Sequence, residues 1–189
     1  MASPREKPVG IFDSGIGGLT VLASVRRRLP AESIVYLGDT ARVPYGNKSA
    51  ETVVRYALEC AEFLAERDAK ALVVACNTAS AYALPELRSR FKIPVLGVVE
   101  PGAAAALAVT KRRAVGVIGT SGTISSNAYG SVLKRLDPGC RVVSSSCPLF
   151  VPLVEEGWID GEVAEAAARI YLGGMREEGI DTLILGCTH

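Results

Sequence analysis

Two segments of the sequence place a cysteine at the end of an apolar run. ALVVACNTA covers residues 71–79 and TLILGCTH covers residues 182–189, and small hydroxyl or amide residues follow each cysteine. In open α/β sheets, ligands bind at the carboxyl ends of strands, which is where Cys76 and Cys187 fall. One such thiol is readily explained as a small, inert buried residue. Two thiols with matching surroundings indicate a paired thiol chemistry.

Groups that could assist each thiol stand at comparable places. Asp13 opens DSGIGG (residues 13–18), a glycine-rich turn whose backbone N–H groups could face an anion, although a purely structural turn is the alternative reading. Asp13 could orient or deprotonate Cys76, and His189 could do the same for Cys187. Taking a proton from one face of a carbon and returning it from the other needs two equivalent groups. The paired thiols therefore favour racemisation over nucleophilic attack.

Composition excludes several other classes of protein. The 189 residues are 49% hydrophobic and 22% charged with a net charge of +1, which predicts one or two globular domains without affinity for nucleic acid. The absence of a long apolar run and of a signal-peptide core predicts a cytoplasmic protein that does not span a membrane. Five cysteines without a C-x-x-C pair, and a single histidine, argue against a disulfide scaffold, a thiol redox protein and a metal site. We therefore expect neither a metal nor a cofactor.

Short apolar runs rich in valine and isoleucine alternate with segments of helical period. Continuous rather than alternating hydrophobicity is typical of parallel strands that helices cover on both faces. The expected strands are residues 9–13, 34–39, 71–75, 95–99, 114–119, 141–145 and 182–186. The expected helices are residues 19–29, 79–90, 125–136 and 162–178, with a further helix that begins after an N-cap at Ser49. Cys60 lies on the apolar stripe of that last helix, so we interpret it as a buried hydrophobic residue.

The sequence also contains an internal repeat. Asp13 precedes Cys76 by a spacing similar to that between Thr120 and Cys187, and each first residue stands at the end of an expected strand. This pattern predicts an α/β fold of two similar doubly wound parallel-sheet domains that face each other across a cleft. Proline and glycine near residues 100–102 suggest the boundary, giving domains of residues 1–100 and 101–189.

Long motifs in a fixed order resemble the glutamate racemase family. They are PVGIFDSGIGGLTV (8–21), YLGDTARVPYGNKS (36–49), VVACNTASA (73–81), PVLGVVEPG (94–102), GVIGTSGTISSNAY (116–129), CPLFVPLVEEG (147–157) and LILGCTH (183–189). The resemblance implies a bacterial, cytoplasmic, cofactor-independent isomerase that interconverts L- and D-glutamate by a two-cysteine proton transfer. Such an enzyme supplies D-glutamate for peptidoglycan, the cell wall and cell shape, and we expect a homodimer.

The same resemblance assigns roles to individual positions. Cys76 and Cys187 match the two acid/base thiols, with Asp13 supporting the first and His189 the second. Glu155 matches an auxiliary carboxylate near the second thiol. The residues expected to bind the substrate are Asp13, Ser14, Tyr45, Gly46, Asn77, Thr78, Thr120, Thr123, Thr188 and His189.

Two alternatives remain open at this point. Members of the family usually continue beyond the G-C-T-H motif with a segment that completes the first domain. We therefore expect this chain by itself to be weakly active and to expose apolar surface. An inactive remnant that binds acidic amino acids is one alternative, and a racemase for a related substrate such as aspartate is the other.

Overall fold

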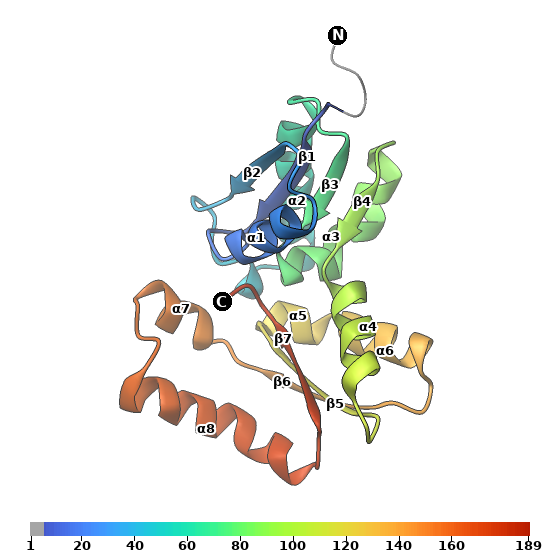
Figure 1. Cartoon of the computed structure of the whole chain (residues 1–189). Helices are drawn as coiled ribbons and strands as arrows, with labels where there is room; N and C mark the ends of the chain where they lie inside the picture. Colours follow the sequence, from blue (N-terminus) through green and yellow to red (C-terminus); the bar gives the residue numbers. More distant parts are fainter. Residues whose placement is uncertain (1–5) are drawn as a thin grey trace. The chain divides into compact units, whose positions relative to one another are not determined.

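The computed structural model describes residues 6–189, which form two compact units. The first unit extends to Val98 and includes Thr188, and the second comprises Val99–Cys187 and His189. Each unit is an α/β structure built on its own parallel sheet (Figure 1). The parallel α/β class predicted from the apolar runs is confirmed, because every one of the seven expected strands is present.

The first unit contains a four-stranded sheet in the order β2-β1-β3-β4. Its strands are β1 (Val9–Asp13), β2 (Ile34–Gly38), β3 (Ala71–Val74) and β4 (Val95–Gly97). Its helices are α1 (Leu19–Arg28), α2 (Ala50–Ala65) and α3 (Asn77–Arg90), with a short 3₁₀ helix, η1 (Tyr45–Asn47), before α2. All three strand pairings are parallel, so the carboxyl ends of the strands share one edge.

Alternate residues of the central strands belong to different layers of this unit. Phe12 and Leu72 are fully buried in a core that includes residues of α2 and α3. Ile11, the neighbour of Phe12 on β1, belongs instead to a core that includes residues of α1. This division follows from the two-residue period of a strand and explains why the runs are continuously apolar.

Helix α2 begins and packs as its sequence predicts. The Ser49 hydroxyl caps the helix by accepting a hydrogen bond from the Thr52 N–H at 3.3 Å. Cys60 is 2% exposed and Leu64 is fully buried, both within the core of the first unit. The interpretation of Cys60 as a buried residue on the apolar stripe is confirmed.

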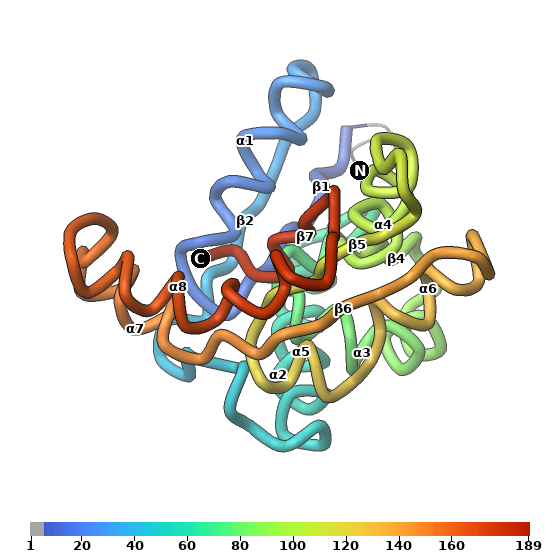
Figure 2. Tube along the Cα trace, turned by 90° about the horizontal axis from the view of Figure 1, so that it is seen from below, coloured from blue at the N-terminus to red at the C-terminus, as the bar shows by residue number. Residues whose placement is uncertain are grey.

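The second unit contains a three-stranded sheet in the order β6-β5-β7. Its strands are β5 (Ala114–Gly119), β6 (Arg141–Ser146) and β7 (Thr182–Gly186). Its helices are α4 (Val99–Val109), α5 (Ser121–Ser125), α6 (Ala128–Leu136), α7 (Phe150–Glu155) and α8 (Gly161–Glu177). Val117 packs in a core with residues of α4 and α6, whereas the next residue, Ile118, packs with residues of α8. These helices therefore cover different faces of the sheet (Figure 2).

Several expected helices differ from the observed ones. Pro101 and Gly102 lie inside α4 rather than in a connector, because backbone N–H groups in the first helical turn need no intrahelical acceptor and tolerate proline. The helix expected at residues 125–136 begins later, as α6 at Ala128, and the short helix α5 before it was not predicted. Asn127 separates the two helices through a left-handed conformation with φ of 52°. Helix α7 was not predicted, and α3 begins at Asn77, two residues earlier than expected.

The two sheets repeat one arrangement of strands. In the first unit β1 lies between β2 and β3, and in the second unit β5 lies between β6 and β7. Cys76 follows β3 and Cys187 follows β7, so the two thiols stand at equivalent positions of the repeat. This arrangement confirms the internal repeat inferred from the spacing of Asp13, Cys76, Thr120 and Cys187.

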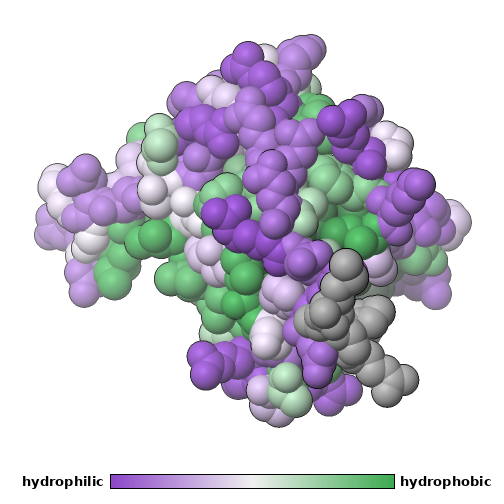
Figure 3. All heavy atoms as spheres, turned by 90° about the horizontal axis from the view of Figure 1, so that it is seen from above, coloured by the Kyte–Doolittle hydropathy of each residue, from purple (hydrophilic) through white to green (hydrophobic). Residues whose placement is uncertain are grey.

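Hydrophobic side chains also reach the surface. Figure 3 shows hydrophobic patches among hydrophilic residues on one face, and the large exposed side chains include Ile16, Leu19 and Leu29 of the α1 region. Helix α1 itself has no fully buried residue. Within residues 6–189, no helix is both long and apolar enough to cross a membrane.

Candidate functional site

Cys76 occupies the N-cap of helix α3. Its backbone is extended, and its sulfur accepts a hydrogen bond from the Ala79 N–H at 3.5 Å. The preceding residue, Ala75, donates its N–H to the Phe12 carbonyl at 2.8 Å and so anchors the loop to β1. The side chain of Cys76 is buried, and a helix N-terminus favours negative charge on a neighbouring group. The fold thus places a buried thiol at the N-terminus of a helix.

Asp13, the last residue of β1, is fully buried in the glycine-rich turn. Its Oδ2 atom accepts hydrogen bonds from the N–H groups of Gly15 and Gly18, both at 3.1 Å. The Thr188 hydroxyl lies 3.4 Å from each carboxylate oxygen. The turn was expected to bind an external anion, but these two N–H groups bind the carboxylate of Asp13 itself. A β-carbon at Gly18 would lie 2.5 Å from that of Asp13, which explains the glycine.

The remaining predicted residues of the first unit are buried polar groups near the carboxyl edge of the sheet. Ser14 follows β1 directly, and Asn77 and Thr78 form the first turn of α3. All three are buried, with at most 7% of their surface exposed. Tyr45 and Gly46 lie in η1 and are also buried. Buried polar side chains at this edge are consistent with a site for a small polar ligand.

Tyr36 is a neighbour of this site that the motifs did not single out. Its hydroxyl donates a hydrogen bond to the Gly15 carbonyl at 2.7 Å. Burial, followed by the negative charges of Asp13 and Cys76, raises the pKa of its phenol well above the usual range. Tyr36 therefore remains protonated while it holds the turn. It is the middle residue of β2 and the first residue of the motif at 36–49, but that motif assigned it no role.

In the second unit, three side chains form a series that ends at the second thiol. The sulfur of Cys187 lies 3.7 Å from Nδ1 of His189, and Nε2 of His189 lies 2.5 Å from Oε1 of Glu155. The interaction with Cys187, followed by that with Glu155, outweighs burial and raises the pKa of His189 to about 9. The imidazole is therefore protonated at neutral pH, next to the sulfur.

Thr120 and Thr123 lie at the carboxyl end of β5. The Thr120 hydroxyl caps α5 by accepting from the Thr123 N–H at 3.2 Å, and both residues are buried. Tyr129, on α6, is a neighbour that ends the motif at 116–129 but to which the sequence assigned no role. Burial, followed by the charge of Cys187, raises the pKa of the Tyr129 phenol to about 12. Each thiol therefore has a tyrosine in its electrostatic surroundings, the half-buried Tyr36 for Cys76 and the buried Tyr129 for Cys187.

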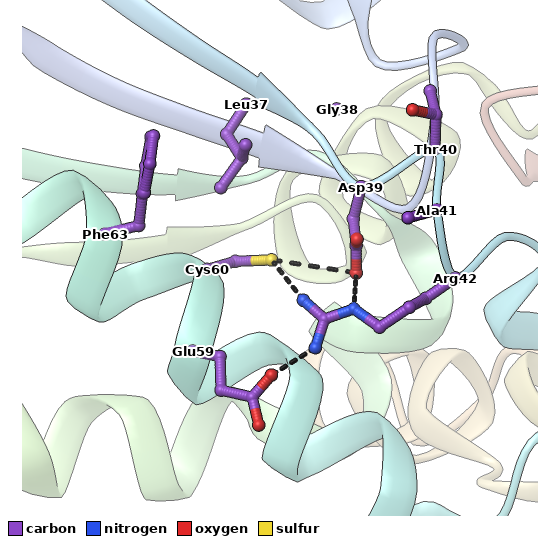
Figure 4. Close-up of a pocket in the computed structure, with 9 residues that line it drawn as sticks. All are labelled: Leu37, Gly38, Asp39, Thr40, Ala41, Arg42, Glu59, Cys60 and Phe63. Atoms are coloured by element: carbon purple, nitrogen blue, oxygen red, sulfur yellow. Dashed lines mark hydrogen bonds and ion pairs between the residues drawn. The ribbon is translucent and has the colours of Figure 1, made fainter.

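A separate hollow of about 240 Å³ opens at the end of β2 (Figure 4). Asp39 accepts a 2.6 Å hydrogen bond from Nε of Arg42 and another from the Tyr45 hydroxyl, and Arg42 also pairs with Glu59. Burial raises the pKa of the Cys60 thiol to about 11, which keeps it protonated at neutral pH. The residues that line the hollow are Leu37, Gly38, Asp39, Thr40, Ala41, Arg42, Glu59, Cys60 and Phe63. This network supports the buried ring of Tyr45.

Comparison with known proteins identifies the family. The family described as Asp/Glu/Hydantoin racemase matches residues 17–189. The chain belongs to this racemase family. A glutamate racemase from Geobacter metallireducens is 63% identical over 183 residues, which make up 97% of this chain and 68% of that protein. The family match includes both cysteine motifs.

Solved structures of glutamate racemases share the fold of this racemase-family chain. The enzyme from Bacillus anthracis superposes with a TM-score of 0.95 at 48% identity, covering 98% of this chain and 70% of that one. The enzyme from Francisella tularensis, solved in complex with D-glutamate, gives a TM-score of 0.92 at 42% identity, with coverage of 98% and 70%. The recognition made from the motifs is confirmed.

Proposed function

We propose that this chain interconverts L-glutamate and D-glutamate by proton transfer between two thiols, Cys76 and Cys187. The observation that carries the proposal is the repeat itself. Two cysteines stand at equivalent strand ends in two equivalent units, and each unit also supplies an acid/base side chain, Asp13 in the first and His189 in the second. The high identity to glutamate racemases supports glutamate as the substrate.

In one direction of the reaction, the thiolate of one cysteine removes the α-hydrogen of glutamate as a proton. The electron pair of the C–H bond remains on the α-carbon, and the second cysteine donates its own proton to the opposite face. The two sulfurs thereby exchange protonation states, and turnover in the other direction restores them. The mechanism requires the two units to present their thiols to opposite faces of one α-carbon.

The supporting side chains differ between the two thiols. Next to Cys187, the protonated ring of His189, held by Glu155, can stabilise a negative sulfur or return a proton to it. On the side of Cys76, the buried carboxylate of Asp13 can orient the thiol or accept its proton. One thiol would thus be assisted by a cationic side chain and the other by an anionic one.

The hydroxyl and amide groups near the thiols would bind the substrate. Ser14, Asn77 and Thr78 offer donors from the first unit, as do Tyr45, Gly46 and Thr188, and Thr120 and Thr123 from the second. Donors directed at the α-carboxylate stabilise the charge that develops when the α-carbon loses its proton. This electrostatic stabilisation would replace the electron sink that a cofactor provides in other racemases.

The biological setting follows from the same proposal. The enzyme would be a cytoplasmic homodimer of a bacterium and would supply D-glutamate for peptidoglycan. No cofactor and no metal is needed for proton transfer between two thiols. Sedimentation of the purified protein tests the dimer.

The proposal is tested by proton NMR of L-glutamate incubated with the protein in deuterated, reducing buffer. Each proton taken up by a thiol exchanges with solvent deuterium, so the α-proton signal is expected to disappear as D-glutamate forms. Chiral chromatography of the same sample measures the D-enantiomer directly. A parallel incubation with L-aspartate tests the specificity for glutamate.

The control is the double variant in which Cys76 and Cys187 are both replaced by serine, whose hydroxyl does not ionise near neutral pH. This variant should keep the circular dichroism spectrum and lose the exchange. Full retention of the α-proton signal with the folded wild-type protein would contradict the racemase proposal and favour the alternative of a protein that only binds acidic amino acids.

A further inference from the structure

Tyr36 is connected to Asp13 through a single residue of the glycine-rich turn. The Tyr36 hydroxyl donates to the Gly15 carbonyl at 2.7 Å, and the Gly15 N–H donates to Oδ2 of Asp13 at 3.1 Å. The carbonyl of Gly15 therefore accepts a hydrogen bond from β2, and its N–H donates another to the carboxylate of Asp13. The ring of Tyr36 packs beside Ile11 in the core with α1 residues, which fixes the hydroxyl in space.

The two glycines beside this chain of hydrogen bonds leave no room for a side chain. A β-carbon at Gly18 would lie 2.9 Å from the Tyr36 hydroxyl oxygen, and one at Gly38 would lie 2.5 Å from the Gly15 carbonyl oxygen. Both distances are shorter than real carbon contacts, so the backbone of the turn and of β2 lies close against the groups that make these hydrogen bonds. A displacement of the turn would consequently move the carboxylate of Asp13.

We propose that Tyr36 is a positioning residue for the proton transfer at Cys76: its hydroxyl holds Gly15 so that the turn fixes the carboxylate of Asp13. The inference rests on the proposed racemase function. Tyr36 does not exchange a proton itself, because burial and the nearby negative charges of Asp13 and Cys76 keep its phenol protonated. Its contribution is geometric.

The variant Tyr36→Phe removes the hydroxyl and retains the ring, so the protein should fold. We expect kcat to fall about tenfold and KM to change less than twofold, since the loss concerns proton transfer rather than binding. The decisive readout is the primary isotope effect measured with α-deuterated L- and D-glutamate. It should increase for the enantiomer deprotonated at Cys76 and decrease for the other, because only one of the two proton transfers becomes slower.

The matched control is Tyr82→Phe, which removes a hydroxyl from a half-buried tyrosine of α3 in the same unit. This variant should show wild-type kcat and isotope effects. Unchanged kinetics in Tyr36→Phe would overturn the proposal. So would a loss of kcat in which both enantiomers keep their isotope effects, since that result indicates general loosening of the fold.

A second measurement needs no turnover of glutamate. The rate at which iodoacetamide alkylates Cys76 is followed against pH by mass spectrometry, since the tryptic peptide 71–88 contains this cysteine and no other. Without the Tyr36 hydroxyl, the turn and the carboxylate of Asp13 can move away from Cys76, which removes a nearby negative charge. The pH midpoint of Cys76 alkylation should therefore be lower in Tyr36→Phe than in the wild type by at least about half a pH unit. An unchanged midpoint contradicts the positioning role even if the wild-type protein racemises glutamate. A shifted midpoint without wild-type turnover preserves that role and rejects the racemase.

Discussion

At the scale of single residues, the pair formed by His189 and Glu155 determines the charge next to the second thiol. Replacing Glu155 by glutamine keeps the shape of the side chain and removes its negative charge. We expect the pKa of His189 to decrease from about 9 towards its ordinary value of 6.5, although Cys187 continues to raise it. Racemisation should slow about tenfold. Because the sequence contains one histidine, a single ring signal in an NMR titration reports this pKa.

The same pair makes stability depend on pH. The folded-state pKa of His189 lies above 6.5, so its contribution to stability is complete below about pH 6.5 and is lost as the pH rises through about 9. The shift corresponds to at most about 3 kcal/mol in the free energy of unfolding. Urea denaturation at about pH 6.5 and at about pH 9 measures how much the free energy of unfolding decreases over this range. The decrease should be smaller for Glu155→Gln than for the wild type. The control Glu156→Gln changes an exposed neighbour, and equal effects of the two variants would contradict the pairing.

The sequence indicated the residues that carry reactive groups, but it did not indicate the neighbouring residues that fix their positions through hydrogen bonds. Cys76 and Cys187 were recognisable because a thiol after an apolar run is rare and occurs twice. Tyr36 was hidden, because a tyrosine in a strand is usually explained by packing and its hydrogen bond joins β2 to the turn after β1, which is distant in the sequence. The role of the turn was misread for a related reason. Whether its N–H groups bind a ligand or Asp13 depends on side-chain orientation, which spacing does not specify.

At the scale of elements, one carboxylate joins the loop after α4 to the start of β7. Asp181 accepts hydrogen bonds from the Thr110 hydroxyl at 2.5 Å and from the N–H groups of Lys111 and Arg112 at 2.7 and 2.8 Å. The bond from Thr110 is the main cause that lowers the pKa of Asp181 to about 2. These bonds fix the strand that leads to Cys187.

We therefore expect Asp181→Asn to lower the melting temperature at neutral pH, because the amide replaces a charged acceptor of four donors, these three and the Thr182 hydroxyl. The contribution of Asp181 is present above its ordinary pKa of 3.8 and is lost as the pH falls through about 2. The melting temperature of the variant should accordingly vary less than that of the wild type over this acidic range. Asp160→Asn, in which the side chain makes no capping bond to α8, serves as the control. Equal melting temperatures for Asp181→Asn and wild type would show that these bonds are dispensable.

Element boundaries were predictable where a local rule decides them. Ser49 marks the start of α2 because a hydroxyl before an apolar stripe is a recognised N-cap. Asn127 divides α5 from α6 through a left-handed backbone, which asparagine tolerates but does not require. Helix α7 is too short to show a helical period in the sequence. The strands were easier to predict, because a continuous run of valine and isoleucine is typical of a strand whose two faces are both buried.

At the scale of the whole molecule, the repeat predicts that both thiols are required for racemisation and that they act on opposite faces of the α-carbon. In Cys76→Ala the remaining thiol, Cys187, can reach only one face of the α-carbon, and in Cys187→Ala only the other face is served. Neither variant should racemise glutamate. Each should still exchange the α-proton of one enantiomer with solvent deuterium, without inversion, and the two variants should act on opposite enantiomers.

The measurement is proton NMR of separate L- and D-glutamate samples in deuterated buffer with each single variant. Exchange should be slower than in the wild type, because the proton must return from the thiol that removed it. Deuteration of the same enantiomer by both variants would contradict the assignment of the thiols to opposite faces. Exchange of both enantiomers by one variant would show that another group replaces the missing thiol. Complementary exchange by the two single variants, together with racemisation by the wild type, is the result expected from the proposed transfer between Cys76 and Cys187.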